Sequence, residues 1–314
     1  MYGTIHTQEN MSAYRNALKN TFERCEDMKK RFLCLALMMV LVLFSFALIG
    51  CGEDEEVVVE PSADVHPALA DAVAGDGITL TIATDPTYPP FQSMVGGEVV
   101  GFDVDIVNAM AEYLGAEVEF VFFEWDALLT ALSADSRDFD FAASAMTITE
   151  ERAQTILFSN PYFVSFQALS VPYDSDITSI DDLGEGSRVA VQNGTTGHMF
   201  ATDHLEDLGV TIMPYAGGQE CFLAMAAGEV DGVIIDIPVA LNQADEGGFE
   251  LRTVPIPAAE QENFGFSMGQ SRTSIADAVN QALAAIIADG TYAEIYARWI
   301  DADSAPVMPP TPTP

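Results

Sequence analysis

Residues 139–163 read FDFAASAMTITEERAQTILFSNPYF, and the order of residue types in them predicts a buried strand that ends in a turn. The apolar run at 139–143 is typical of such a strand, and small residues with a Thr-Ile-Thr that could open a helix follow it. Arg152 then places a positive charge in a chain whose charges are mostly acidic. Taken alone, these residues favour an ordinary helix cap at Thr147 and a solvated helix arginine at Arg152.

Apolar runs alternate with helical patterns on both sides of this stretch. The first series predicts strands at 78–83, 118–123 and 139–143, separated by helices at 103–114 and 125–134. The second series predicts strands at 189–191, 210–213 and 232–235, separated by helices at 197–208 and 221–227. Two successive βαβαβ patterns indicate an α/β chain with two lobes. Because ligands in open α/β sheets bind beyond the carboxyl ends of strands, two facing lobes predict a cleft between them.

The composition describes a folded and strongly acidic protein. Its 314 residues are 49% hydrophobic, which is ample for a packed core, and the net charge is −36. That charge argues against nucleic acid or an anionic membrane surface as the main partner. Six of the twelve basic residues and four of the 48 acids precede Cys51, so six arginines and 44 acids follow it. Such a surface suits salt-rich habitats, where salt screens self-repulsion, although a protein that is merely acidic has the same composition.

The N-terminal region has the layout of an export signal. Residues 28–51, MKKRFLCLALMMVLVLFSFALIGC, place three cations before a long apolar run, and an uncleaved membrane anchor is the alternative. LIGC at 48–51 resembles a bacterial lipobox, which implies that Cys51 is lipidated and becomes the mature N-terminus. The chain is then extracytoplasmic and lipid-anchored to the cell membrane. Cys221 is the other mature cysteine, so we expect no disulfide and a small, buried, apolar role for it.

The remaining terminal segments are assigned by composition. Residues 1–27 are a leader or a misassigned start, and 28–50 are the lipoprotein signal peptide. Residues 51–77 are acidic and punctuated by Pro and Gly, which is typical of a tether between membrane and domain. Residues 302–314 form a Pro-rich tail that we expect to be disordered.

Across residues 78–301 the sequence resembles the extracytoplasmic solute-binding proteins of amino-acid ABC importers, family 3. Six stretches carry the resemblance, in the family's order and spacing: ATDPTYPPF (83–91), GFDVDIVNAMAEYLG (101–115), FDFAASAMTITEERAQTILFSNPYF (139–163), VAVQNGTTG (189–197), GEVDGVIIDIPVA (228–240) and DGTYAEIYARWI (289–300). The resemblance implies a two-lobed, type II α/β fold in which each lobe is a mixed sheet flanked by helices. Lobe 1 is then 78–166 plus 256–301, lobe 2 is 167–255, and a two-segment hinge crosses near 164–171 and 252–257.

The resemblance also implies roles for residues that would hold the backbone of an amino acid. Arg152 matches the family's arginine that grips the α-carboxylate, and a guanidinium fork suits that group. Thr147 matches a residue that offers hydroxyl and amide contacts, and the carbonyl of Ala145 matches one that receives the α-ammonium. Thr195 and Thr196, in a Gly-Thr-Thr-Gly turn that opens a helix, match residues that close over the carboxylate from the second lobe.

Other family positions point to the ammonium and the ligand side chain. Asp236 matches the acid that pairs with the α-ammonium, and a helix-capping role is its alternative. Asp85 and Tyr88 match one wall of the side-chain pocket and Trp125 an aromatic on the opposite wall, although both aromatics would also suit a plain core. These walls favour a basic or polar amino acid. The family match makes Asp103 and Asp105 structural rather than metal ligands, near the start of a helix.

The function implied by the resemblance is binding of a free L-amino acid and its delivery to an ABC importer. The expected partners are the amino-acid ligand, a permease with its ATPase, and the membrane. We expect a monomer that needs no cofactor or metal and binds no nucleic acid. One alternative is an enzyme on the same fold, similar to cyclohexadienyl or arogenate dehydratase, which needs a general acid such as Glu124. Another is a ligand-sensing domain.

Overall fold

The structure is a computed structural model that describes residues 78–256 and 259–301. The leader and signal segments at 1–50, Cys51 with the tether at 51–77, and the tail at 302–314 lie outside the described residues. No helix in the described ranges is long and apolar enough to cross a membrane.

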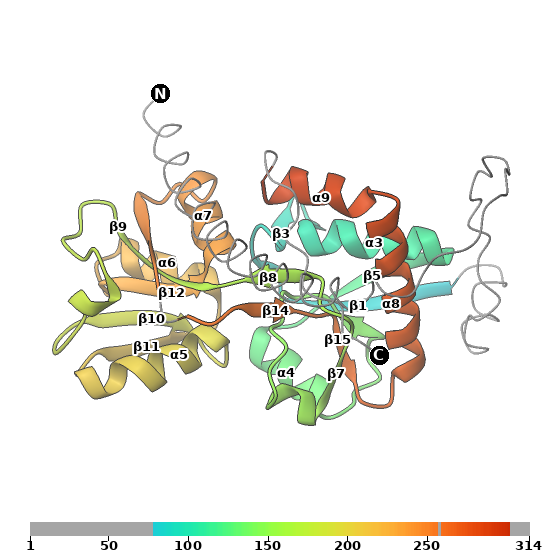
Figure 1. Cartoon of the computed structure of the whole chain (residues 1–314), viewed down its shortest axis with the longest axis horizontal. Helices are drawn as coiled ribbons and strands as arrows, with labels where there is room; N and C mark the ends of the chain where they lie inside the picture. The colour runs from blue at the N-terminus through green and yellow to red at the C-terminus, as the bar shows by residue number, and fades with distance from the viewer. Residues whose placement is uncertain (1–77, 257–258, 302–314) are drawn as a thin grey trace, which may run out of the picture. The chain divides into compact units, whose positions relative to one another are not determined.

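The first sheet has five strands and combines both ends of the described chain. In spatial order these are β5 (Ala116–Phe122), β1 (Ile78–Thr84), β6 (Phe141–Ala142), β15 (Ser267–Gly269) and β7 (Ile156–Phe158). Strand β1 is parallel to both β5 and β6, whereas β15 is antiparallel to β6 and β7, so the sheet is mixed. In Figure 1 one side of it carries α3 (Phe102–Leu114), α8 (Thr273–Ala288) and α9 (Thr291–Trp299), and the other side α4 (Trp125–Ser133).

The second sheet also has five strands and lies wholly within the middle of the chain. In spatial order these are β11 (Thr211–Tyr215), β10 (Arg188–Gln192), β12 (Gly232–Asp236), β9 (Gln167–Pro172) and β13 (Leu251–Pro255). Strand β12 is buried at every position because it lies between two neighbours and under helices, which explains its unbroken apolar run. Its helices are α5 (Thr196–Leu205), α6 (Gly218–Ala226) and α7 (Ile237–Asp245) (Figure 1).

The chain passes between the two sheets twice, each time through a short strand. On the way out it forms β8 (Phe163–Ser165), and on the way back β14 (Glu262–Phe264), and these two strands pair antiparallel. The crossing segments expected from the sequence overlap β8 and β9 at 164–171 and β13 at 252–257, of which residue 257 is not described. A small three-stranded sheet follows β1 and contains β2 (Thr87–Tyr88), β3 (Gln92–Val95) and β4 (Glu98–Val100).

Aromatic side chains form much of the core beside the first sheet. The rings of Tyr162 and Phe266 stack at 4.3 Å, and Phe102 meets Phe163 edge-on at 5.5 Å. These residues are fully buried, so the core holds β8 and the ends of β15 and α3 in one place. Cys221, on α6, is a free, fully buried thiol whose pKa burial raises to about 12, as expected for a small apolar role.

Two predicted helices differ in detail from the structure. The turn after Thr147 opens no α-helix: it contains one 3-10 turn, η1 (Arg152–Gln154), because Thr147 pairs with Phe264 in an isolated bridge instead. The predicted helix at 221–227 begins earlier, at Gly218, because the Glu220 carboxylate accepts the N–H groups of Ala216 and Gly217 and so caps it.

The helix predicted at 197–208 also changes character near its end. Its α-helical part stops at Leu205, and the 3-10 helix η3 (Glu206–Leu208) continues it to Gly209, which adopts the left-handed conformation with φ 83°. The remaining 3-10 turn in the described chain is η2 (Ile180–Asp182). The strand predicted at 139–143 is paired over only two residues, as β6, although Phe139 and Ala143 are buried too.

Candidate functional site

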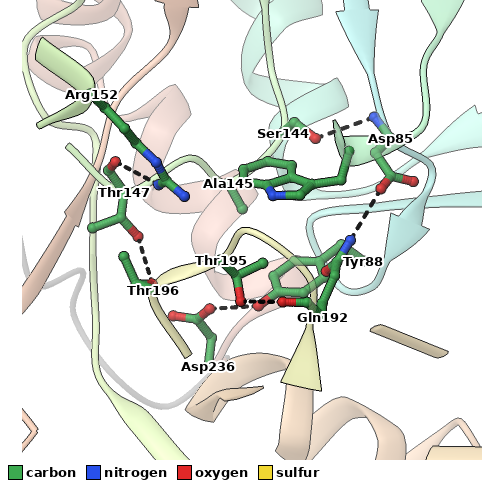
Figure 2. A pocket seen from close by; sticks show the side chains of 11 residues that line it. Asp85, Tyr88, Ser144, Ala145, Thr147, Arg152, Gln192, Thr195, Thr196 and Asp236 are labelled. Atoms are coloured by element: carbon green, nitrogen blue, oxygen red, sulfur yellow. Dashed lines mark hydrogen bonds between the residues drawn. The ribbon is translucent and has the colours of Figure 1, made fainter. Parts of the chain in front are cut away.

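A cleft with about 340 Å³ of empty volume, including space open to solvent, brings the candidate residues together. All nine residues singled out from the sequence line it: Asp85, Tyr88, Trp125, Ala145, Thr147, Arg152, Thr195, Thr196 and Asp236. Ser144 and Gln192 line it as well, and Figure 2 shows these side chains converging. Many of the lining residues end or follow a strand: Asp85 follows β1, Ser144 and Ala145 follow β6, and Gln192 and Asp236 end β10 and β12. The cleft therefore lies at the carboxyl ends of parallel strands, where α/β folds bind ligands.

Arg152 is the cation of this cleft and is 7% exposed. Its Nη1 donates to the Thr147 carbonyl at 2.9 Å, and its Nη2 donates to the Gly194 carbonyl, from the loop after β10, at 3.0 Å. The guanidinium carbon lies 5.4 Å from the centroid of the Trp125 ring. Burial lowers the pKa of Arg152, and nearby carboxylates, Glu262 foremost, oppose that effect. Arg152 is therefore not a solvated arginine on a helix. Its guanidinium keeps N–H groups that can donate to a carboxylate.

Ala145 has a backbone that a buried carboxylate holds in place. Its φ is 47°, in the left-handed region that a non-glycine residue rarely adopts, and its N–H donates to Oδ2 of Asp103 at 2.9 Å. Asp103 also accepts from Gln92 at 2.6 Å and from the Tyr162 hydroxyl at 2.8 Å. Burial raises the pKa of Asp103 to about 6, although these hydrogen bonds lower it in part.

Both aspartates at the start of α3 are engaged with other parts of the protein, as the sequence led us to expect. Asp103 accepts the three hydrogen bonds just described, whereas Asp105 accepts 2.6 Å and 2.7 Å hydrogen bonds from Arg298 and Trp299 of α9. The described residues contain no cluster of three or more His, Cys, Asp or Glu that could hold a metal ion.

Asp236 is the acid at the opposite side of the cleft and is 5% exposed. Its Oδ2 accepts the Tyr88 hydroxyl at 2.5 Å, and its Oδ1 accepts the Ser165 hydroxyl at 2.6 Å. Burial and, next, the charge of Glu262 raise the pKa of Asp236 to about 7. Asp236 precedes α7 but makes no side-chain capping bond, so its carboxylate serves the cleft and not the helix.

Asp85 occupies a separate end of the cleft, on the loop after β1. It is 5% exposed, and burial raises its pKa. Its Oδ1 accepts from the Thr87 hydroxyl at 2.8 Å, and its Oδ2 accepts from Nε2 of Gln192 at 3.4 Å. Trp125 is buried nearby in the lining, and its indole N–H has no hydrogen-bond partner among the described residues. A buried carboxylate beside aromatic walls can accept from a polar or cationic ligand group.

The sequence prediction missed two residues that line the cleft, Ser144 and Gln192, and one acid that contacts the lining, Glu262. Gln192 is the last residue of β10, one position beyond the predicted strand, and a polar residue ending an apolar strand was the signal for it. Ser144 lies in the quoted stretch and its hydroxyl accepts the N–H of Asp85 at 3.2 Å. Glu262 accepts from Thr147 and Thr196, and nothing in the pattern of its three-residue strand marks it.

Comparison with known proteins relates this cleft to a family. Residues 80–302 match the bacterial extracellular solute-binding proteins, family 3. The ABC transporter glutamine-binding protein GlnH of Bacillus subtilis (strain 168) is 29% identical over 279 residues, which cover 88% of this chain and 99% of that protein. The arginine-binding periplasmic protein of Mannheimia haemolytica is 34% identical over 224 residues, which cover 70% of this chain and 90% of that protein.

A solved structure supports the same relationship. The ancestral amino acid-binding protein AncCDT-1, a precursor of cyclohexadienyl dehydratase, is 34% identical with a TM-score of 0.65, over 71% of this chain and 95% of that one. The fold is the two-lobed, type II fold of periplasmic amino-acid-binding proteins. With most of its described residues matched in sequence and in structure, this chain belongs to the bacterial extracellular solute-binding proteins, family 3.

Proposed function

We propose that this protein binds a free L-amino acid in its cleft, outside the cytoplasm, and delivers it to an ABC importer. One observation carries the proposal: a buried cation, Arg152, and a buried acid, Asp236, face one cleft. Arg152 lies in the turn η1 between two strands of the first sheet, and Asp236 ends a strand of the second. A zwitterion presents the two opposite charges that such a pair can neutralise. The glutamine- and arginine-binding relatives support an amino acid as the ligand.

The cleft offers a hydrogen-bond donor or acceptor to each charged group of the ligand's backbone. Arg152 takes the α-carboxylate with two parallel hydrogen bonds, and Thr147, Thr195 and Thr196 surround the same group. Asp236 takes the α-ammonium, together with the carbonyl of Ala145. The side chain of the ligand then extends toward the opposite end of the cleft.

The chemistry at that end favours a basic or polar side chain. Asp85 can accept from an ammonium, guanidinium, imidazole or amide, and Tyr88 and Trp125 form aromatic walls beside it. A cation that packs against such a ring gains about 0.5–2 kcal/mol. Gln192 adds an amide that can rotate between Asp85 and the ligand.

Binding is coupled to closure of two lobes. We infer that lobe 1 is 78–166 plus 256–301, that lobe 2 is 167–255, and that the connecting strands form the hinge. Bonds that link the two sheets favour the closed arrangement, including those from Arg152 to Gly194 and from Tyr88 to Asp236. Because a ligand contacts both halves only when they are shut, its differential affinity drives closure.

The location follows from the N-terminal sequence. Residues 28–50 direct export, Cys51 carries the lipid, and residues 51–77 tether a monomeric domain to the cell membrane. The excess of acids over arginines then suits a salt-rich medium.

We propose binding without turnover. The acid considered for a dehydratase, Glu124, is exposed at the start of α4 and is not among the residues that line the cleft. A general acid must come within hydrogen-bond reach of the reacting group, which an exposed side chain outside the lining does not do.

A thermal-shift screen of residues 52–314 against the twenty amino acids tests the proposal. A ligand present at a hundredfold excess over its Kd stabilises the folded state by about 2.7 kcal/mol, so at least one amino acid should raise the melting temperature. The same samples, incubated with prephenate and arogenate, should leave both compounds intact. If no amino acid shifts melting while either compound is consumed, the protein is an enzyme.

A further inference from the structure

Glu262 places an additional carboxylate beside the cleft, against two threonines that line it. It is half-buried on β14, and its Oε2 accepts the Thr147 hydroxyl at 2.5 Å and the Thr196 hydroxyl at 2.8 Å. Its Oε1 accepts Nε2 of Gln167 at 3.0 Å. One carboxylate therefore joins the turn after β6 to the start of α5 and to β9.

The hydrogen bonds to Glu262 use the hydroxyl protons of Thr147 and Thr196, which a ligand carboxylate would need as donors. Each threonine hydroxyl has one proton and two lone pairs, so a hydroxyl that donates to Glu262 can only accept from other groups. The hydroxyl oxygens of Thr147 and Thr196 lie 3.5 Å apart, and Oε2 of Glu262 accepts from both. A ligand carboxylate cannot receive a hydrogen bond from either hydroxyl until that bond to Glu262 is broken.

We propose that Glu262 is a specificity-determining residue whose carboxylate occupies the hydroxyl donors of Thr147 and Thr196 and competes there with the carboxylate of an incoming ligand. The proposal rests on the function proposed above for the identity of the ligand. Its consequence is that Glu262 reduces the advantage of a free carboxylate over an uncharged carboxamide. Arg152 supplies that advantage, and Glu262 offsets part of it.

The same bonds link the two sides of the cleft. Thr147 lies beside β14, whereas Thr196 and Gln167 belong to elements of the second sheet. Glu262 thus helps to keep the cleft shut before a ligand arrives, and the ligand carboxylate takes over that link when it binds. Hydrogen bonds to a charged acceptor are shorter and about twice as strong as neutral ones, so the link depends on the charge of Glu262.

The test compares the full-length protein with Glu262→Gln, and with Glu260→Gln as the matched control. Glu260 is exposed two residues away, so its change removes the same charge without touching the threonines. Calorimetry gives Kd for L-arginine, L-glutamine and L-histidine and for the C-terminal amide of each. In Glu262→Gln the ratio of the Kd of the amide to the Kd of the free amino acid should rise by about tenfold. A change of that size corresponds to one hydrogen bond to a charged group, and Glu260→Gln should leave the ratio unchanged.

Acrylamide quenching of tryptophan fluorescence measures the closure without any ligand. Trp125 is 6% exposed in the cleft lining, whereas Trp299 lies on α9 and donates to Asp105, so only the first reports on the cleft. Glu262→Gln should be quenched more than the parent and Glu260→Gln, and an amino acid should reverse the difference. Equal quenching in all three proteins overturns the role of Glu262 in closure.

The outcomes separate the two proposals. If the parent binds an amino acid but its preference for acid over amide is unchanged or lower in Glu262→Gln, the competition is wrong and the proposed function stands. If the parent binds none of the twenty amino acids of the thermal-shift screen, the proposed function fails and the competition with it. Greater quenching of Glu262→Gln would still show that Glu262 closes the cleft.

Discussion

The hydroxyl of Tyr88 donates a 2.5 Å hydrogen bond to Oδ2 of Asp236, although the two residues are 148 positions apart in the chain. Tyr88 belongs to β2, after the first strand of one sheet, and Asp236 ends a central strand of the other. The bond therefore joins the proposed side-chain wall to the proposed ammonium site. It also satisfies a buried carboxylate that would otherwise need a ligand cation as its partner.

Ligand binding should depend on pH through Asp236. Burial and the charge of Glu262 raise its pKa to about 7, whereas hydrogen bonds from Ser165, Tyr88 and Gln167 lower it in part. An α-ammonium needs the ionised acid, so below about pH 7 the ligand must displace a proton and the affinity should fall by up to about tenfold per pH unit. Calorimetric titrations from about pH 8 to about pH 5 measure this directly. A Kd that is constant across that range would contradict the assignment of Asp236 to the ammonium.

The choice of ligand side chain should depend on Asp85. Asp85→Asn keeps the shape of the side chain and its bond to Gln192 but removes the charge that would attract a cation. We expect arginine and lysine to bind at least about tenfold more weakly, because a hydrogen bond to a charged group contributes about 1.5–3 kcal/mol. Leucine or methionine, measured in the same titrations, are the internal control and should change little. An equal loss for all ligands would place Asp85 at the ligand backbone instead.

The membrane anchor should depend on Cys51, which lies outside the described residues. Cys51→Ser leaves the proposed export signal at 28–50 intact but removes the thiol that would receive the lipid. We expect the variant to appear in the soluble extracytoplasmic fraction of fractionated cells, whereas the parent stays with the membrane. Cys221→Ser serves as the control, because that thiol is buried in the hydrophobic core. Membrane retention of Cys51→Ser would indicate an uncleaved anchor.

The central strands of both sheets were predictable from apolar runs, as in β12, which is buried at every position. The site residues were predictable through the family resemblance, and among them Asp236 also ends a buried strand. Prediction from the local sequence pattern was wrong where contacts between residues distant in the sequence decide the structure. Thr147 pairs with Phe264, more than a hundred residues away, and the turn after it opens no α-helix. The sequence did not predict Glu262 as part of the site for the same reason. A three-residue strand has no periodicity, and the hydrogen-bond partners of Glu262 are distant in sequence.

The stability of the folded chain should rise with salt at low ionic strength. Few cations offset the acids, and three of the arginines in the described ranges already form ion pairs: Arg188 with Asp231, Arg272 with Asp140, and Arg298 with Asp105. The unpaired acids repel one another, and the screening length falls from about 10 Å at 0.1 M to about 3 Å at 1 M. Calorimetric melting should therefore shift upward mostly below about 0.5 M, similarly for NaCl and KCl. A melting temperature that is flat or falling over this interval would exclude self-repulsion as a significant cost.

Arg152 should be the residue on which binding of every amino acid depends. It is 7% exposed, and its bonds to the carbonyls of Thr147 and Gly194 hold the guanidinium fork in one orientation. Removing one partner of a desolvated charge pair costs about 2–5 kcal/mol, so Arg152→Ala should weaken all amino acids by at least about 30-fold. Arg152→Lys should recover only part of the affinity, since an ammonium cannot reproduce two parallel hydrogen bonds. The control is Arg137→Ala, because Arg137 is exposed and bonds to Ser271, so its loss should leave every Kd unchanged. Melting curves without ligand establish that each variant folds, and a folded Arg152→Ala that binds like the parent would remove the carboxylate assignment and most of the proposed site with it.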